Sequence, residues 1–212
     1  MELKGHTESV WSLASLSNGN LASSSEDSTI KIWNVSDGKL LKTLIGHRAG
    51  IGRLIRLSNG DLASAADDHV IKIWDVSKGT LKTNLTGHTD EVNGLVLLSN
   101  GALASGSKDR SVKIWNMSDY TLIKTLTGCD LALWSLLELP SGALLIGSKG
   151  ALCELDISNG TVKNKFKAHD DGIWALKMLK SGDLTSGSYD STIKVWNVRD
   201  WTEKKTLFGL IL

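Results

Sequence analysis

Four stretches of the chain contain a histidine, a serine, an aspartate and a tryptophan in the same order and at the same spacing. Histidine, serine and aspartate could form a hydrolytic triad, in which the imidazole takes the serine proton and the carboxylate orients the imidazole. The same side chains can also satisfy one another in a buried network, with the indole N–H as a further donor. The four sets are His6, Ser23, Asp27 and Trp33; His47, Ser64, Asp68 and Trp74; His88, Ser105, Asp109 and Trp115; and His169, Ser186, Asp190 and Trp196.

The repetition of the set favours a structural role. An active site occurs once and exposes a nucleophile beside oxyanion donors, whereas this set recurs in four places. We therefore expect structural networks and no catalytic residue. His69 lies outside the pattern and is expected in a solvent-facing turn. No histidine has cysteine or carboxylate neighbours at ligand spacing, so we expect no metal and no other cofactor.

The elements that would position these side chains repeat with a fixed period. Gly-His pairs begin at Gly5, Gly46 and Gly87, 41 residues apart, and degenerate copies follow at Gly128-Cys129 and Ala168-His169. Each histidine of a set precedes its tryptophan by 27 residues. This period and signature resemble the WD-repeat family of β-propellers, and the resemblance covers essentially the whole chain.

The resemblance implies an all-β propeller of four-stranded antiparallel blades, in which each set forms a buried hydrogen-bonded tetrad within its blade. We expect one domain over residues 1–212, with five blades at about 5–45, 46–86, 87–127, 128–167 and 168–208. Propellers of this family usually have roughly seven blades, and residues 209–212 would begin a sixth copy. We therefore expect an open arc or incomplete propeller, with a natural five-bladed propeller as the alternative.

The fourth copy departs from the others at every position of the set. It has Cys129, Ile146, Gly150 and Leu155 in place of histidine, serine, aspartate and tryptophan. Losing one member of a buried network would strand its partners at about 1–3 kcal/mol, whereas replacing all of them by apolar groups is nearly neutral. The wholesale replacement favours a structural network. Glu154 stands at a position where the other copies are apolar, which leaves open whether this copy packs poorly or forms a contact.

Composition narrows the class of partner. The 24 basic and 23 acidic residues give a net charge of +1, so no overall field favours nucleic acid or membrane as a partner. No apolar run approaches the ~18 residues of a membrane span, and the first residues lead into repeat sequence rather than a signal peptide. Cys129 and Cys153 lack metal spacing and are too few for a disulfide framework, which favours a reducing compartment. A cytoplasmic location is expected, with the nucleus as the alternative.

Two positions in each copy are expected on the face where partners of this family commonly dock, over the central opening. The position in the first strand carries Trp11, Gly52, Asn93, Trp134 and Trp174. The position before the aspartate of the set carries Glu26, Asp67, Lys108, Lys149 and Tyr189. Aromatic residues among polar ones are typical of binding hot spots, although they equally fill gaps between blades. The charges run from acidic to basic around the ring, which would suit a peptide of both signs; ordinary surface variation is the alternative.

These observations predict a non-catalytic protein–protein interaction scaffold that presents a propeller face to peptide segments of partner proteins, in a multi-protein complex. A second hypothesis is a substrate-recruiting or sensing module of a larger enzyme, such as a ubiquitin ligase or a signalling ATPase. Residues 1–212 do not distinguish the two. Hydrolase activity from the His, Ser and Asp sets is disfavoured.

Overall fold

The chain folds into β-strands joined by turns. The computed structural model describes residues 2–209, which contain 19 strands. No helix in this part of the chain is long and apolar enough to cross a membrane. The all-β prediction with antiparallel strands is therefore confirmed. The sixth copy expected to begin at residues 209–212 falls almost wholly outside the described residues.

The first twelve strands form three separate four-stranded sheets. Within each sheet, strands that are consecutive in the sequence pair antiparallel. The first sheet contains β1 (Val10–Ser15), β2 (Leu21–Ser25), β3 (Thr29–Trp33) and β4 (Leu40–Ile45). The second contains β5 (Ile51–Arg56), β6 (Leu62–Ala66), β7 (Ile71–Asp75) and β8 (Thr80–Leu85). The third contains β9 (Val92–Leu97), β10 (Leu103–Ser107), β11 (Val112–Trp115) and β12 (Leu122–Leu126).

The remaining strands form one seven-stranded sheet. They are β13 (Ser135–Glu138), β14 (Leu144–Gly147), β15 (Lys149–Leu155), β16 (Val162–Met178), β17 (Leu184–Ser188), β18 (Thr192–Asn197) and β19 (Thr202–Phe208). Strand β16 is 17 residues long and serves two neighbours. Its residues 162–167 pair with β15, and its residues 173–178 pair with β17.

The continuity of β16 differs from the expectation that the fourth and fifth copies form separate four-stranded sheets. Gly150 has a φ of 76° and lies against the His169 carbonyl, so that a Cβ there would come within 2.6 Å of the carbonyl oxygen. The glycine therefore lets the start of β15 approach the segment that connects the two copies. Lys149 pairs with Gly172, and the connecting segment continues as strand instead of breaking into a loop.

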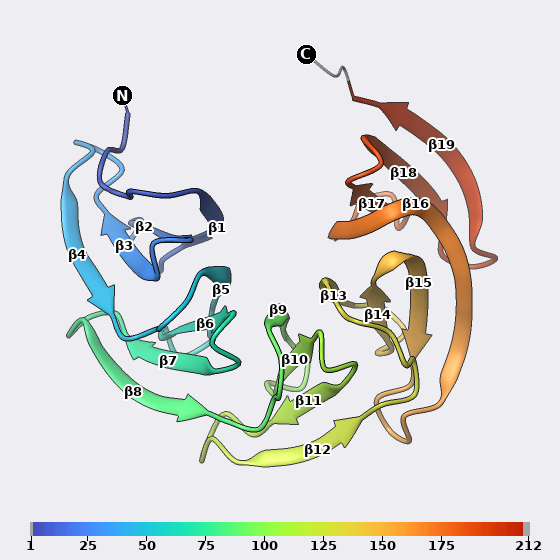
Figure 1. Ribbon diagram of the computed structural model, residues 1–212, viewed down its shortest axis with the longest axis horizontal. Helices are drawn as coiled ribbons and strands as arrows, with labels where there is room; N and C mark the ends of the chain where they lie inside the picture. Colours follow the sequence, from blue (N-terminus) through green and yellow to red (C-terminus); the bar gives the residue numbers. More distant parts are fainter. Residues whose placement is uncertain (1, 210–212) are drawn as a thin grey trace.

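Figure 1 shows the sheets side by side along an arc. In the three four-stranded sheets the first strand lies on the inner side of the arc and the last strand lies on the outer side. The first sheet stands at one end of the arc, and β17–β19 stand at the other. Among the described residues, no strand of the first sheet pairs with a strand of the last.

The core lies between neighbouring sheets. Successive side chains of a strand point to opposite faces of the sheet, so one strand contributes apolar side chains to the core on both sides. On β6, Leu62 and Ala66 pack with the first sheet, while Ala63 and Ala65 pack with the third sheet. These side chains are fully buried. Burying an aliphatic side chain of leucine size stabilises a fold by about 1.5–3 kcal/mol. A sheet that is apolar on both faces therefore gains this stabilisation on both faces only when both are covered.

The two sheets at the ends of the arc keep one apolar face in solvent. Leu13 of the first sheet is 61% exposed, and Ile193 of β18 is 48% exposed. The equivalent positions in the inner sheets lie against neighbours, as Leu54 and Leu95 do. The exposure therefore follows from position at the end of the arc rather than from a different sequence pattern.

Candidate binding site

The structure brings the four members of each predicted set into one hydrogen-bonded network. In the third sheet, Nδ1 of His88 lies 2.7 Å from the Asp109 carboxylate, and Nε2 lies 2.8 Å from the Ser105 hydroxyl. The Trp115 indole N–H donates to the same hydroxyl at 2.8 Å. With the imidazole proton on Nδ1, the serine accepts from tryptophan and donates to histidine, so every polar atom of the network is used. The other three sets repeat these contacts at 2.7–2.8 Å.

The serine hydroxyls of these networks are badly placed for nucleophilic catalysis. Ser64, Ser105 and Ser186 are fully buried, and Ser23 is 4% exposed. A nucleophile must reach a substrate carbonyl, whereas each of these hydroxyls is enclosed between an imidazole and an indole. The geometry suits a network that holds the sheet to its loops.

The aspartate of each tetrad connects two loops at one edge of its sheet. One oxygen of Asp109 accepts the Ser111 N–H at 2.8 Å, and the other accepts the Thr89 N–H at 3.1 Å. Burial opposes ionisation of Asp109, but the hydrogen bonds from Ser111, His88 and Thr89 outweigh it and lower the carboxyl pKa to about 2. The carboxylate therefore stays charged and holds both loops at neutral pH.

The residue after each tetrad aspartate has a left-handed backbone. Ser28, His69, Arg110 and Ser191 have φ values between 64° and 68°. Each turn thus has the same shape, and the residue before the aspartate is presented in the same way each time. His69 is exposed in this turn, as expected.

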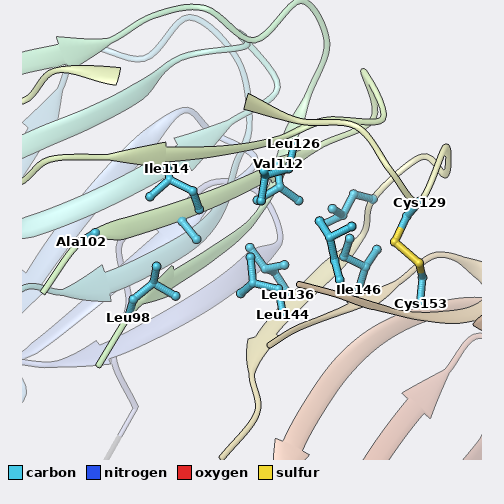
Figure 2. Close-up of a cluster of buried hydrophobic side chains, with 13 residues drawn as sticks. Leu98, Ala102, Val112, Ile114, Leu126, Cys129, Leu136, Leu144, Ile146 and Cys153 are labelled. Carbon is cyan, nitrogen blue, oxygen red and sulfur yellow. A yellow bond between two sulfur atoms is a disulfide. The ribbon is translucent and has the colours of Figure 1, made fainter. Parts of the chain in front are cut away.

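In the fourth copy a disulfide takes the place of the polar network. Cys129 and Cys153 are bonded to each other, although the sequence favoured a reducing compartment, in which such bonds are rare. Two cysteines are too few for a framework of several bonds, but they are enough for one. Cys129 stands where the tetrads have histidine, and the chain brings Cys153 of β15 beside it. Ile146 and Leu155 fill the remaining space within the apolar core, as Figure 2 shows for Ile146 and the disulfide.

A cavity of about 620 Å³ opens on the inner side of the arc, and we call it the central cavity. Inner strands β1, β5, β9 and β16 contribute to its wall, together with the turns that precede the tetrad aspartates. Six of the nine predicted face residues line it: Trp11, Glu26, Asp67, Asn93, Trp174 and Tyr189. A cavity of this size falls in the range of sites that bind small molecules or a few residues of a peptide.

The other three predicted face residues do not line the central cavity. Trp134 stacks on Trp174, with ring centroids 4.8 Å apart. Lys108 forms an ion pair with Glu91, which itself lines the cavity. Lys149 is exposed outside it. The predicted gradient from acidic to basic around the ring is therefore not present within the cavity.

Two of the three face tryptophans are fixed by packing. Trp134 lies across the backbone of Gly172, where a Cβ would come within 1.4 Å of its ring, so only glycine fits beneath it. Trp174 lies between Trp134 and Tyr189, with centroids at 4.8 and 5.0 Å. Trp11 differs because it is 50% exposed, and its indole N–H donates to Glu26 at 2.7 Å. Trp11 is therefore the face tryptophan most available to a bound molecule.

Arg53 is a cavity residue that the sequence reasoning missed. It extends from β5, its Nε donates to the Asn93 carbonyl at 3.1 Å, and its terminal nitrogen donates to the Trp174 carbonyl. Burial lowers the pKa of the guanidinium, which nevertheless stays charged at neutral pH. The side chain ties three sheets together across the inside of the arc. No signal in the repeat pattern could have found it, since the equivalent positions of the other copies carry other residues.

Comparison with known proteins explains the shared geometry of the tetrads. The family model described as WD domain, G-beta repeat, matches residues 1–34, 38–75, 79–116 and 160–197, which is well over half of the chain. The chain belongs to the WD-repeat family. The four positions at which the fourth copy has lost its tetrad lie within residues 117–159, between the third and fourth matched WD repeats.

A curated relative agrees with the family assignment over a short segment. Cell division control protein 4 of Saccharomyces cerevisiae is 46% identical over 35 residues. The segment is 16% of this chain and 4% of the yeast protein, so the chain matches only a small part of that protein's length. The similarity supports membership of the WD-repeat family.

In each matched WD repeat, the tetrad sets the position of one predicted face residue, and three of these four residues line the central cavity. The aspartate holds the turn between the second and third strands, and the residue before it is Glu26, Asp67, Lys108 or Tyr189. WD repeats generally mediate protein–protein interactions, and their domains are generally non-catalytic. The tetrads thus help to fix the positions of Glu26, Asp67 and Tyr189 in the wall of the central cavity.

Proposed function

We propose that this WD-repeat chain is a non-catalytic interaction scaffold that binds a peptide segment of a partner protein in the central cavity. The observation that carries the proposal is the gathering of Trp11, Trp174 and Tyr189 with Glu26 and Asp67 around one opening. Large aromatic side chains beside polar groups are the composition of binding hot spots. Assembly into a multi-protein complex is part of the same proposal.

We further propose that the five groups of strands are five propeller blades of one domain, in an open arc. The blades would span residues 5–45, 46–86, 87–127, 128–167 and 168–208. Three four-stranded sheets and the division of β16 between β15 and β17 support this reading. The inner edge of such an arc would present the central cavity to a partner.

The function is tested by binding of the full chain to an immobilised library of random nonapeptides. We expect a subset of peptides to bind, and we expect Trp11→Ala to weaken that binding at least tenfold. Trp11 is a sharper test than Trp174, because Trp174 packs against two other rings and its loss would disturb the fold. Trp201→Ala serves as a control, since Trp201 is a partly exposed tryptophan outside the central cavity.

Thermal melts of both variants separate binding from folding. Equal binding by Trp11→Ala and the unmodified chain would place the peptide elsewhere. Failure of the unmodified chain to bind any peptide of the library would contradict the proposal that it is a peptide-binding scaffold.

A further inference from the structure

The charged groups of the central cavity are unequal in number. Three carboxylates line it, those of Glu26, Asp67 and Glu91, against the single guanidinium of Arg53. Arg53 directs its recorded hydrogen bonds to backbone carbonyls and forms no ion pair among the described residues. Lys108 neutralises Glu91 from outside the cavity. The wall therefore keeps an excess of negative charge around a space that is open to solvent on one side, so its attraction for a cation should depend on salt concentration.

Asp67 is the least compensated of the three carboxylates. Within residues 2–209 its side chain has neither a hydrogen-bond donor nor an ion-pair partner. Burial raises the pKa of Asp67, and the negative charges of Glu91 and Glu26 raise it further. The net effect is a carboxylate that would be stabilised by an added cation.

Glu26 is held over the cavity in a fixed position. Trp11 donates to one of its oxygens at 2.7 Å. The carboxylate lies on Gly50 of the second sheet, where a Cβ would come within 3.0 Å of it. Glycine at position 50 thus allows a carboxylate from the first sheet to lean towards Asp67. The two acidic groups face the same space from neighbouring sheets.

Aromatic rings form another part of the wall. Trp11, Trp174 and Tyr189 line the cavity with their rings. An aromatic ring attracts a cation over its face, and it also packs against the methylene stem of lysine or arginine.

We propose that the central cavity binds the side chain of a lysine or arginine in the partner peptide. The cationic end lies among Glu26, Asp67 and Glu91, and the methylene stem packs on Trp11 and Trp174. This inference rests on the proposed function, because it specifies the peptide that the scaffold recognises. The same charges would repel a phosphorylated or acidic segment, so the preference is for basic peptides.

The test uses the full chain and immobilised nonapeptides with acetylated and amidated ends, in which the central residue is varied and the flanks are random. We expect central lysine or arginine to bind at least tenfold more tightly than central glutamate or phosphoserine. Acetyl-lysine keeps the stem and removes the charge, so it should bind several-fold more weakly than lysine. Binding of the lysine peptides should weaken as salt concentration rises.

Two variants assign the effect to the cavity. Glu26→Gln combined with Asp67→Asn should reduce binding of lysine peptides at least tenfold, with little change for peptides that lack a basic residue. Glu154→Gln makes the same kind of charge change on β15 and should leave binding unaltered. If the double variant does not fold, the comparison of lysine with acetyl-lysine on the unmodified chain still decides the question.

The outcomes separate this inference from the proposed function. Peptide binding without preference for lysine or arginine would overturn the inference and leave the interaction scaffold intact. A basic preference that survives the double variant in folded form would also overturn it, because the cation would then bind elsewhere. Binding of no peptide at all would overturn both.

Discussion

The serine of each tetrad is the residue on which the other members converge. Its hydroxyl accepts the tryptophan N–H and bonds to the histidine, as Ser105 does with Trp115 and His88. Ser105→Ala would leave both of these buried groups without a partner. An unsatisfied buried polar group costs about 1–3 kcal/mol, so we expect the free energy of unfolding to fall by at least about 2 kcal/mol.

Urea unfolding of Ser105→Ala measures this loss. Ser99→Ala is the matched control, because the Ser99 hydroxyl donates to Glu138 at an exposed site. Its loss should cost about 0.5 kcal/mol or less. Equal effects of the two substitutions would show that the tetrad contributes no more than a surface hydrogen bond.

The pKa values of Asp109 and His88 in the folded chain predict how the free energy of unfolding depends on pH. The folded-state pKa of Asp109, about 2, lies below its usual value of 3.8. A carboxyl whose pKa is lowered by folding stabilises the fold above its unfolded value, so this contribution should be lost as the pH falls from about 4 towards 2. Burial also lowers the pKa of His88 from 6.5. The unfolded chain then binds this proton more readily, and stability should begin to fall below about pH 6.5.

Thermal melts from pH 7 to pH 2 test this dependence. Asp109→Asn cannot titrate, so it should be less stable at pH 6 and should lose less of its remaining stability between pH 4 and 2. Parallel pH profiles for the variant and the unmodified chain would contradict the assignment to Asp109.

Part of the candidate site could be predicted at the level of residues. The tetrad positions follow from a spacing that repeats, and so do the residues before the tetrad aspartates. Arg53 could not be predicted, because its partners are backbone carbonyls on two other sheets, one of them 121 residues away. The ion pair of Lys108 with Glu91 could not be predicted either. The repeat pattern describes the residue type at each position, and it does not show which side chains will be in contact.

Among the elements, the fourth copy shows how a disulfide can substitute for a tetrad. The bond joins the segment before β13 to β15 and closes a loop of 24 residues. A loop of this length reduces the entropy of the unfolded chain by an amount worth about 3 kcal/mol. We therefore expect reduction to lower the Tm by about 6–12 °C, given about 2–4 °C per kcal/mol in a chain of this size.

Melts with and without dithiothreitol test this contribution. The double variant Cys129→Ala, Cys153→Ala is the control, and its Tm should not respond to the reductant. Quantification of free thiols in the unfolded, unreduced chain should find none. Two free thiols per chain, or a Tm that reductant does not change, would show that the bond does not form or does not stabilise the fold.

Most elements could be predicted from the alternation of apolar residues and the turn residues between them. Strands β2 and β3 are examples, since the turn residues Glu26, Asp27 and Ser28 separate them. Strand β16 could not, because its continuity depends on Gly150 approaching the His169 carbonyl. A contact between two copies is not visible in the periodicity of either.

At the scale of the whole molecule, the uncovered faces at the ends of the arc predict self-association. Leu13 on β1 is 61% exposed, within the apolar face that the inner sheets bury against a neighbour. Exposed apolar faces of sheets favour association. We expect light scattering on residues 1–212 to give a mass that rises with concentration above the 22.9 kDa of one chain.

A charge on the uncovered face should reverse this behaviour. Leu13→Lys should bring the mass closer to that of one chain. Leu41→Lys, on the outer strand β4, is the control and should have little effect. A concentration-independent mass of one chain for the unmodified protein would contradict the prediction.

The continuous strand β16 also affects how the arc can move. Two sheets that share a strand cannot change the angle between them without breaking its hydrogen bonds. The first sheet is joined to the second by the loop of residues 46–50, which can absorb a change of angle, whereas Arg53 ties the second sheet to β9 and β16. The central cavity therefore has one stiff wall, carrying Trp174 and Tyr189, and one adjustable wall, carrying Trp11 and Glu26. A bound peptide would be clamped by the N-terminal side of the arc closing onto a stationary C-terminal side.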